Sequence, residues 1–389
     1  MLVHSYYDED SRVRGEAEAL VRAGIPVVVL GLRRPGDPAF AMVEGVEIRR
    51  LGVQRHQGAG MGIYLREYVS FMCRAGWVAT RLARRRRFRL AHVHSLPDFL
   101  VFATLPLRLA GTPVLLDLHE AMPEFFRSRF AGRHSLFHRA LVIQERASIG
   151  YASAVVTVNT ALRDRLIDLG VEPMKVTVIP NGPTLKRFDP HAHPRRAFRT
   201  DAVLRLIYAG ALTPTYELDV AIRAVAEIHR RRPELNTRFD VFGQGDSEMM
   251  LRALVAELGL DDRVTFHGRV PIDRIPAAIA AADIGLAPTR RDPFTELSIS
   301  TKLLEYAAME KPIVASGLPL VLSTFPPGSI ETYESGDASS LANAVERIAD
   351  DVSGRAAAIE GAREVARRLG WEATAERLVG LIDLIAPER

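Results

Sequence analysis

The sequence predicts two α/β domains, each a Rossmann-like fold in which helices cover a parallel sheet. The chain has 389 residues, which exceeds the size of one typical hydrophobic core and suits two domains. Short apolar runs alternate with segments of helical periodicity in both halves, as expected for parallel sheets with helices on their faces. Between the halves, residues 183–203 are rich in proline, histidine and arginine without periodicity, which indicates a linker.

Composition and charge are those of an ordinary globular protein, and they exclude several classes of function. Hydrophobic residues make up 48% and charged residues 25%. The formal net charge is only +4, so nothing in it indicates nucleic-acid binding. Cys73 is the single cysteine, which rules out an intrachain disulfide and a cysteine-based metal cluster. Because we find no apolar run of membrane-spanning length and no signal-peptide layout, we expect a cytoplasmic protein.

The N-terminal half opens with a strand–helix–strand pattern over residues 2–7, 15–23 and 26–30. Its first loop, residues 8–14, falls at the carboxyl end of the predicted sheet, where ligands bind in such folds. The loop has no glycine-rich phosphate motif, which argues against a nicotinamide dehydrogenase. The further strands and helices that we expect cover residues 62–83, 90–94, 99–110, 113–119, 154–158, 175–182, 204–208, 217–231, 237–242, 247–258, 264–266, 272–282 and 284–286.

Residues 295–316 predict a polar loop, a helix and a short buried strand. Ser298, Ser300 and Thr301 are residue types that cap a helix start, and Pro312 ends the helix. A helix start offers backbone N–H groups and the positive end of the helix dipole, which together suit a phosphate group.

Two charged residues follow on this predicted helix. Lys302 lies in the first turn, where a cation is unfavourable for the helix alone but favourable beside an anion. Glu305 lies one turn further on, where a carboxylate can accept hydrogen bonds from ribose hydroxyls. The alternative is an ordinary capped helix on which both side chains are solvated, and these residues alone do not decide between the two.

Residues 305–312, Glu-Tyr-Ala-Ala-Met-Glu-Lys-Pro, resemble the nucleotide-sugar motif of the family-four retaining glycosyltransferases. The strings Asp-Leu-His-Glu at 117–120 and Ile-Pro-Asn-Gly at 179–182 are similar to further segments of that family. The resemblance extends over almost the whole chain. It implies the GT-B fold, an α/β architecture of two Rossmann-like domains with parallel sheets facing across a cleft.

The resemblance also implies a division of the chain. Residues 1–182 would form an N-terminal, acceptor-side domain, completed by a C-terminal helix over residues 366–389. Residues 183–365 would form the domain that binds the nucleotide sugar.

For the donor, the resemblance assigns Glu305 to the ribose, Lys302 to the diphosphate and Glu296 to the sugar. Eight residues separate Glu296 from Glu305, where the family pattern has seven, so the assignment of Glu296 departs from that pattern. We expect Ser300 and Thr301, at the helix start, to contact the nucleotide diphosphate as well.

Gly210 and Gly243 follow predicted strands, and glycine there lets the backbone approach a phosphate closely, although tight turns need glycine in any case. Many family members place a cation pair after the first glycine turn, and this chain has none in that segment. We therefore expect Lys302 to bind the diphosphate, with Arg290 and Arg291 as helpers.

His119 ends a predicted strand, and the resemblance assigns it a hydrogen bond to the donor sugar. The alternative is a structural histidine bonded to a nearby backbone carbonyl. We expect His94 to line the cleft and His92 to lie within the sheet. Residues 10–13, Asp-Ser-Arg-Val, are similar to a family loop near the acceptor and the reacting phosphate.

The function implied by the resemblance is transfer of a sugar from a nucleotide-diphosphate sugar to a glycan or lipid-linked acceptor. Retention of the anomeric configuration and a role in polysaccharide or cell-envelope synthesis are implied with it, and no metal or other cofactor. Two alternatives remain open. One is a GT-B epimerase or phosphorylase, and the other is a catalytically weak, nucleotide-sugar-binding partner subunit, because the usual cation pair is missing.

The pattern of residues 62–83 predicts an amphipathic helix, and a run of basic residues follows this helix. Because a helix between strands needs a face to bury, we expect its apolar stripe to pack on the sheet. The run suits contact with anionic lipid at the inner face of the plasma membrane, where a lipid-carried acceptor would be found. The alternative is a merely solvated run. Its members are Arg84, Arg85, Arg86 and Arg87.

Overall fold

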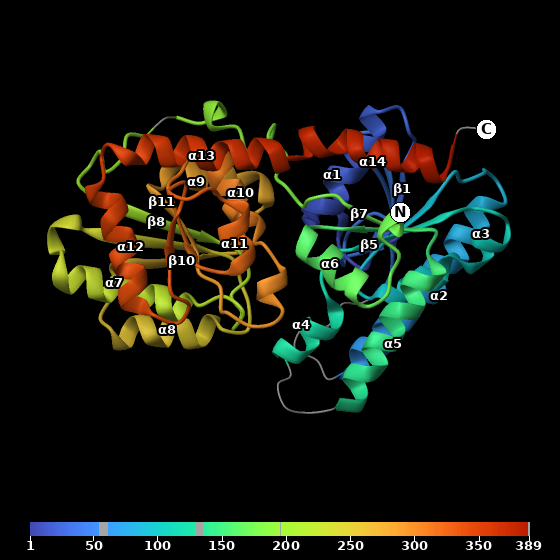
Figure 1. The fold of residues 1–389 in the computed structure, drawn as a ribbon, viewed down its shortest axis with the longest axis horizontal. Helices are drawn as coiled ribbons and strands as arrows, with labels where there is room; N and C mark the ends of the chain where they lie inside the picture. Colours follow the sequence, from blue (N-terminus) through green and yellow to red (C-terminus); the bar gives the residue numbers. More distant parts are fainter. Residues whose placement is uncertain (54–60, 130–134, 195, 388–389) are drawn as a thin grey trace. The chain divides into compact units, whose positions relative to one another are not determined.

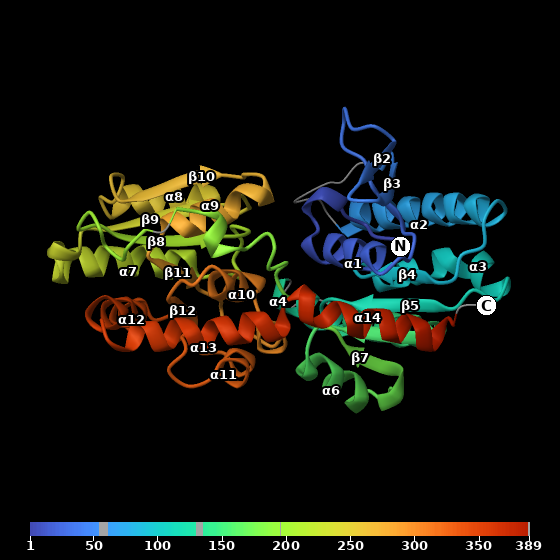
Figure 2. The same cartoon turned by 90° about the horizontal axis from the view of Figure 1, so that it is seen from above.

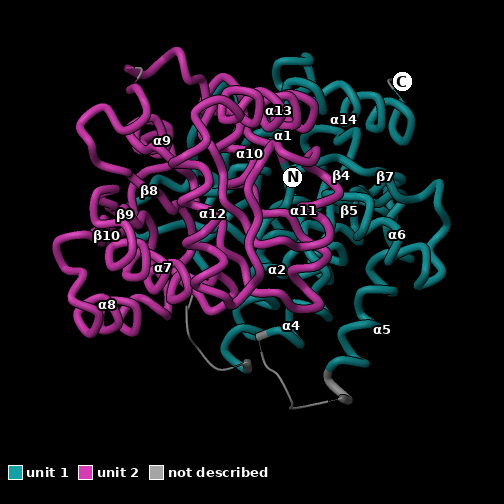
Figure 3. The backbone as a smooth tube through the Cα atoms, turned by 60° about the vertical axis from the view of Figure 1, so that its left-hand side comes forward, with its two compact units in different colours: residues 1–181, 371–389 teal, residues 182–370 magenta. Residues whose placement is uncertain are grey.

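The chain divides into two compact units, drawn in different colours in Figure 3. Unit 1 comprises Met1–Asn181 and Trp371–Arg389, and unit 2 comprises Gly182–Gly370. Each unit is an α/β fold built on parallel strands, as the sequence predicted. In this computed structural model, the described part of the chain comprises residues 1–53, 61–129, 135–194 and 196–387.

The sheet of unit 2, part of which is labelled in Figure 1, consists of six parallel strands. Their order is β10-β9-β8-β11-β12-β13. Its order reverses between β8 and β11, so the chain winds outward from this point in both directions. Ligands of such sheets bind outside the carboxyl ends of the strands at the reversal. The strands are β8 (Leu204–Ala209), β9 (Thr237–Phe242), β10 (Val264–Gly268), β11 (Ile284–Ala287), β12 (Ile313–Ser316) and β13 (Glu331–Tyr333).

Helices cover both faces of this sheet because successive side chains of a strand point to opposite faces. In β8, Leu206 belongs to the core under α7, α8 and α12, while the next residue, Ile207, belongs to the core under α9, α10 and α13. The helices are α7 (Leu218–Arg231), α8 (Glu248–Glu257), α9 (Ile275–Ala281), α10 (Thr301–Ala308), α11 (Pro319–Thr324), α12 (Ala338–Asp350) and α13 (Gly354–Leu369).

The sheet of unit 1 has four parallel strands in the order β4-β5-β6-β7, beside a group of three in the order β1-β3-β2 (Figure 2). The strand β2 is antiparallel to β3. Leu2 forms isolated bridges to both Leu30 and Val93 and so joins the two groups. The strands are β1 (Val28–Leu32), β2 (Phe40–Val43), β3 (Val46–Leu51), β4 (Ala91–His94), β5 (Val114–Leu118), β6 (Ala154–Thr157) and β7 (Val176–Val178).

Two expected elements of unit 1 differ in the structure. The strand predicted over residues 2–7 appears as a bridge at Leu2 and as backbone hydrogen bonds to β1 that reach Ser5, after which the chain turns into the short 3-10 helix η1 (Tyr7–Glu9). The helix predicted over residues 99–110 is divided into the 3-10 helix η2 (Asp98–Thr104) and α3 (Leu105–Leu109). Pro106 lies at the start of α3, where its missing N–H cannot continue a helix that began earlier.

The helices of unit 1 include one long segment, α2 (Met61–Ala83), which follows the predicted range 62–83. None of the helices in the described part of the chain has the length and hydropathy to cross a membrane. The other helices are α1 (Ser11–Arg22), α4 (Met122–Arg129), α5 (Ser135–Tyr151), α6 (Thr160–Asp168) and α14 (Trp371–Ile385).

The C-terminal segment expected as one helix over residues 366–389 is interrupted at Gly370, whose backbone is extended (ψ 161°). The helix before it, α13, belongs to unit 2, and α14 belongs to unit 1. Residues 388–389 lie outside the described residues.

The helix α14 packs on α1 through Trp371, which is fully buried. A side chain on Gly15 would lie 2.5 Å from the indole Nε1, so only glycine leaves room for this ring. The guanidinium of Arg12 lies over the same ring, 5.7 Å from its centroid. The C-terminal helix thereby covers Arg12, whose side chain lies in the interior of unit 1.

Candidate functional site

Lys302 lies in the first turn of α10 and is buried, with 4% of its surface exposed. Its Nζ donates a hydrogen bond to Ser300 Oγ at 2.8 Å. It also lies over the rings of Tyr216 and Tyr208, at 3.7 and 5.0 Å from their centroids. Within the described part of the chain, no carboxylate forms an ion pair with this amine. Burial lowers the pKa of Lys302 to about 7, against a smaller opposing effect of Glu305.

The start of α10 is not capped by a side chain, which differs from the expectation drawn from residues 298–301. Ser300 occupies the N-cap position without capping the helix, because its hydroxyl accepts from Lys302 instead. Ser298 donates to the carbonyl oxygen of Phe294 at 3.0 Å. The positive end of the helix dipole and the buried amine are therefore adjacent, which is an arrangement suited to phosphate.

Glu305 lies one turn after Lys302 on the same helix. Burial raises the pKa of Glu305 to about 7, and the positive charges of Lys302 and Arg187 act in the opposite direction. A carboxylate and an amine that both titrate near pH 7 within one turn of a helix are unusual, and such perturbed groups gather at functional sites.

Gly210 and Gly243 meet at the carboxyl ends of β8 and β9. A Cβ atom on Gly243, whose φ is +138°, would lie 1.8 Å from the carbonyl oxygen of Gly210. Both amides are used within the backbone, because Gly210 donates to Phe242 at 2.9 Å and Gly243 donates to Gly268 at 2.8 Å. That the backbone at these two glycines approaches a phosphate closely remains a prediction. Gly210 also leaves room for the lysine, since its Cβ would lie 3.0 Å from Lys302 Cε.

The loop between β11 and α10 is braced by an Asx-type turn, in which Asp292 Oδ1 accepts from the amides of Phe294 and Thr295. Two predicted residues of this loop, Arg290 and Glu296, form their hydrogen bonds with residues other than Lys302. The Arg290 side chain is exposed, and its amide donates to the carbonyl oxygen of Thr215 at 2.9 Å. Glu296 accepts from Arg291 Nε at 2.8 Å on the surface of the unit.

Glu217 organises the neighbouring loops, and sequence reasoning did not identify it. This buried carboxylate accepts from Ser335 Oγ at 2.8 Å, the Gly336 amide at 2.9 Å and Tyr333 Oη at 3.2 Å. Ser335 in turn accepts from the amide of Arg291. Glu217 therefore ties together the loops that follow β8, β11 and β13. Its sequence signal is only a single acid before a helix, and such acids are common on solvated surfaces.

In unit 1, His119 follows the last residue of β5 and lies beside two other polar groups. Its Nε2 lies 3.2 Å from Asp117 Oδ2 and 3.2 Å from His94 Nδ1. Its backbone amide donates to Ser95 Oγ at 3.0 Å. The side chain is 18% exposed, whereas those of Asp117 and His94 are fully buried. His119 is thus held by a buried carboxylate while part of its ring remains accessible.

Arg12 fixes that carboxylate. It donates to Asp117 through Nε at 2.8 Å and Nη2 at 2.9 Å, and it donates to the carbonyl oxygen of Ile179 at 3.0 Å. Burial alone would raise the pKa of Asp117, but Arg12 and the imidazoles of His119 and His94 hold it well below its usual range. The carboxylate therefore stays ionised and orients the His119 ring.

His92 and His94 lie on the same face of β4, with ring centroids 4.3 Å apart. His92 lies within the sheet as expected. His94, which was expected to line a cleft, is fully buried, because its strand is covered by α1 and by its neighbour Asp117. Burial lowers the pKa of His94 to about 4 and that of His92 well below its usual value.

Comparison with known families agrees with this arrangement of two units. Residues 10–182 match the family described as Glycosyl transferase 4-like domain, and residues 204–351 match Glycosyl transferases group 1. The chain belongs to the family-four glycosyltransferases with the GT-B fold. The resemblance inferred from the motifs is thereby confirmed.

Relatives of this glycosyltransferase chain include D-inositol 3-phosphate glycosyltransferase of Stackebrandtia nassauensis, 31% identical over 251 residues. That alignment covers 61% of this chain and 56% of the relative, so the match spans little more than half of the relative's length.

Solved structures of the same fold include sucrose-phosphate synthase from Thermosynechococcus elongatus, with a TM-score of 0.79 and 20% identity over 99% of this chain and 98% of that one. The Anabaena protein HepE in complex with UDP has a TM-score of 0.70 and 15% identity over 98% of both chains. At these identities the likeness concerns the fold.

Proposed function

We propose that this chain transfers a sugar from a nucleoside diphosphate sugar to a glycan or lipid-linked acceptor, with retention of the anomeric configuration. The observation that carries the proposal is the buried amine of Lys302 beside an uncapped helix start, at the reversal point of a doubly wound sheet. Family membership supports the reaction class, and the donor, acceptor and pathway are part of the proposal.

In this proposal the donor diphosphate lies at the start of α10. The bond between the anomeric carbon and the diphosphate oxygen breaks and its electron pair stays on the diphosphate. The acceptor oxygen forms the new bond to the anomeric carbon, and its proton passes to the departing diphosphate. Lys302 and the helix dipole stabilise the charge that grows on the leaving group. An anion also compensates the desolvation of the amine, so the ammonium form is favoured once the donor is bound.

Glu305 is assigned to the ribose of the donor, whose hydroxyls can donate to an ionised carboxylate. Among nucleotides, UDP is the first to test, because HepE was solved with it. We also keep Glu296 as a contact to the transferred sugar, and its exposure leaves the carboxylate accessible to a ligand.

His119 is assigned to a hydrogen bond with the donor sugar. If Nε2–H donates to Asp117 Oδ2, as their separation of 3.2 Å allows, Nδ1 carries a lone pair that can accept from a sugar hydroxyl. The tautomer would be set by the ionised state of Asp117, which Arg12 maintains.

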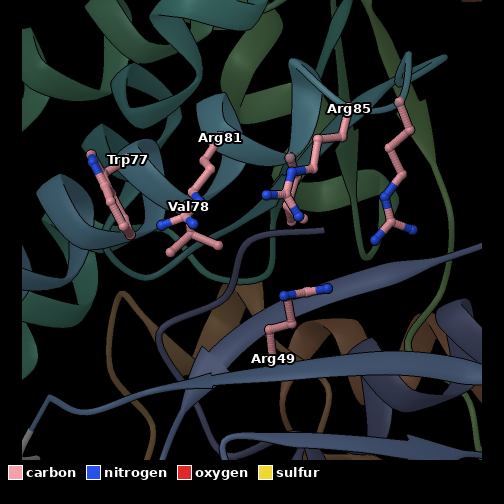
Figure 4. A pocket seen from close by; sticks show the side chains of 7 residues that line it. Arg49, Trp77, Val78, Arg81 and Arg85 are labelled. Carbon is pink, nitrogen blue, oxygen red and sulfur yellow. The ribbon is translucent and has the colours of Figure 1, made fainter.

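A basic surface of unit 1 supports contact with an anionic membrane, on which a lipid-linked acceptor would be found. Arg49 of β3 and four residues of α2 together with Arg85 and Arg86 line a cavity of about 530 Å³ (Figure 4). Trp77 is 63% exposed there, and Arg81 lies over its ring. Exposed cations beside an exposed indole suit the headgroup region of an anionic membrane. The four residues of α2 are Trp77, Val78, Arg81 and Leu82.

The test of the function is a donor screen. The chain is incubated with UDP-, GDP- and ADP-sugars, with and without EDTA, and the products are separated by chromatography. Slow hydrolysis of one donor that Lys302→Ala abolishes is the expected result. Conversion of the donor to its epimer would favour an epimerase instead, and the absence of binding to any donor would favour a catalytically weak partner subunit.

A further inference from the structure

Four side chains of metal-ligand type converge in the interior of unit 1. They are Glu16 of α1, His92 and His94 of β4, and Asp117 of β5. One oxygen or ring nitrogen of each lies within 4.8 Å of the corresponding atoms of the others. None of the four is more than 3% exposed. The sheet itself produces this convergence, because β4 and β5 are parallel neighbours in which His94 is paired with Asp117.

Several ligand atoms of this cluster lack a hydrogen-bond partner. Glu16 Oε2, both ring nitrogens of His92 and Nε2 of His94 are buried and have no hydrogen-bond partner within the described residues, and Glu16 Oε1 has only the ion pair with Arg12 Nη2 at 3.2 Å. Buried polar atoms are nearly always paired, and each exception needs an explanation. Unpaired atoms from three residues that face one another indicate a missing common partner.

Distances between the ligand atoms favour a metal ion as that partner. Glu16 Oε2 lies 3.5 Å from His92 Nε2 and 3.8 Å from His94 Nε2, and His92 Nε2 lies 3.9 Å from Asp117 Oδ2. Tetrahedral zinc with bonds of about 2.0–2.2 Å separates its ligand atoms by roughly 3.3–3.6 Å. We propose that Glu16, His92, His94 and Asp117 bind a divalent transition-metal ion, and that zinc is the ion that this set of two imidazoles and two carboxylates fits.

Arg12 holds both carboxylates in the orientation that such a site requires. Its Nη2 lies 2.9 Å from Asp117 Oδ1 and 3.2 Å from Glu16 Oε1, and its Nε donates to Asp117 Oδ2 at 2.8 Å. Arg12 therefore contacts both oxygens of Asp117 and one oxygen of Glu16, while Glu16 Oε2 faces His92 and His94. Partners of this kind, outside the ligands themselves, orient the ligands of protein metal sites.

The ion would also act on His119. With His94 Nε2 bound to the metal, His94 Nδ1 must carry its proton, and it lies 3.2 Å from His119 Nε2 and 3.3 Å from Asp117 Oδ2. The metal would therefore fix which groups around His119 donate and which accept. The role is structural, and it does not depend on the proposed transfer reaction.

Metal content of the full chain tests this site. The protein is stripped with a chelator, incubated with Zn²⁺, desalted and analysed by inductively coupled plasma mass spectrometry. We expect one zinc per wild-type chain and strong loss of zinc in Glu16→Gln. The matched control is Glu18→Gln, because Glu18 lies on the same helix but pairs with Arg14 at 2.7 Å. It should retain the ion.

Two further measurements on the wild type avoid reliance on a variant that fails to fold. Zn²⁺ should raise the melting temperature of the stripped protein by about 5 °C at a hundredfold excess over Kd, and Mg²⁺ should not. Co²⁺ should give the intense visible absorption of a tetrahedral site. A wild type that retains no zinc and shows neither effect would overturn the proposal, as would zinc bound equally by Glu16→Gln.

Discussion

At the scale of single residues, Lys302 shows how far sequence reasoning reaches. A lysine in the first turn of a helix indicated an anion site, and the structure places it beside Ser300 and two tyrosine rings. That the amine is buried, and that Ser300 serves the lysine instead of the helix, depends on Tyr216 and Tyr208 approaching from another element. Such contacts between distant segments leave no local signal in the sequence.

Lys302→Ala should lower kcat about a hundredfold or more while changing the KM for the donor less. The reason is that negative charge on the leaving group grows toward the transition state, as with removal of one oxyanion-hole donor. Steady-state kinetics with the donor found in the screen measures both constants, with Lys175→Ala in unit 1 as the control for loss of a lysine. An unchanged kcat would mean that Arg290, Arg291 or backbone amides bind the diphosphate instead of Lys302.

Glu305→Ala should weaken binding of the free nucleotide by several-fold to about a hundredfold, because a hydrogen bond to a charged group contributes roughly 1.5–3 kcal/mol. Calorimetry measures the affinity, and circular dichroism checks the fold. The matched control is Glu310→Gln, since Glu310 pairs with Arg363 at 3.0 Å. Equal affinities for wild type and Glu305→Ala would leave Glu305 without a role in the nucleotide site.

Nucleotide binding should depend on pH through Lys302. Its pKa of about 7 in the unliganded protein is below that of free lysine, and a bound diphosphate raises it again. Binding above pH 7 must therefore take up a proton, and affinity should fall by about tenfold per pH unit until the raised pKa is reached. Below pH 7, protonation of Glu305 should weaken binding instead.

The measurement is calorimetry with UDP at about pH 8.5 in two buffers that differ in ionisation enthalpy. Wild type should take up close to one proton, as expected when the pH lies above the free pKa and below the bound one. Lys302→Ala should take up none. Equal apparent enthalpies in both buffers for the wild type would argue against a neutral buried amine at this site.

At the scale of elements, the strands and helices of unit 2 were the most accurately predicted. The strand predicted over residues 237–242 coincides with β9, and the helix over residues 217–231 differs from α7 by one residue. Long periodic segments between glycine turns make such predictions reliable. The strands β2 and β3 of unit 1 were not predicted. The strand β2 is short and has only exposed and half-buried residues, and in β3 the apolar residues are interrupted by Glu47, Arg49 and Arg50.

Gly15→Ala should destabilise unit 1, because its Cβ would lie 2.5 Å from the Trp371 indole. Overpacking of this kind costs about 1–3 kcal/mol. Urea unfolding followed by Trp fluorescence measures the loss. Gly62→Ala is the matched control, since nothing lies within 4 Å of a Cβ at that helical position. Equal stability of both variants would mean that α14 is not firmly packed on α1.

At the scale of the whole molecule, the division into two α/β units followed from length and from the alternation of strands and helices. The residue at which unit 2 ends did not follow from the sequence, because that boundary is Gly370, a single residue between two helices. The polar cluster of unit 1 was also missed as a unit. Its members Glu16, His92 and Asp117 come from three separate elements, and only the pairing of β4 with β5 under α1 joins them.

Changing the four residues of the run Arg84–87 to glutamine should reduce binding to anionic vesicles. All four side chains are exposed, although Arg86 also pairs with Glu47 at 3.0 Å. Each cation near an anionic surface contributes about 1 kcal/mol. Co-sedimentation at low and high salt measures binding, with Arg367→Gln/Arg368→Gln as the control. Wild-type binding that is absent, or insensitive to salt, would leave the run as an ordinary charged surface.

The packing of Trp371 against α1 has a consequence for the order in which the protein is completed during synthesis. Unit 2 lies in the chain between the two segments of unit 1, so the ribosome delivers all of unit 2 before it delivers α14. The core of unit 1 around Arg12 therefore stays incomplete until Trp371 has been synthesised, because the Trp371 ring covers the Arg12 guanidinium. Unit 2 can therefore reach its native state first. The incomplete unit 1 is the part of the chain that a chaperone would need to protect from aggregation.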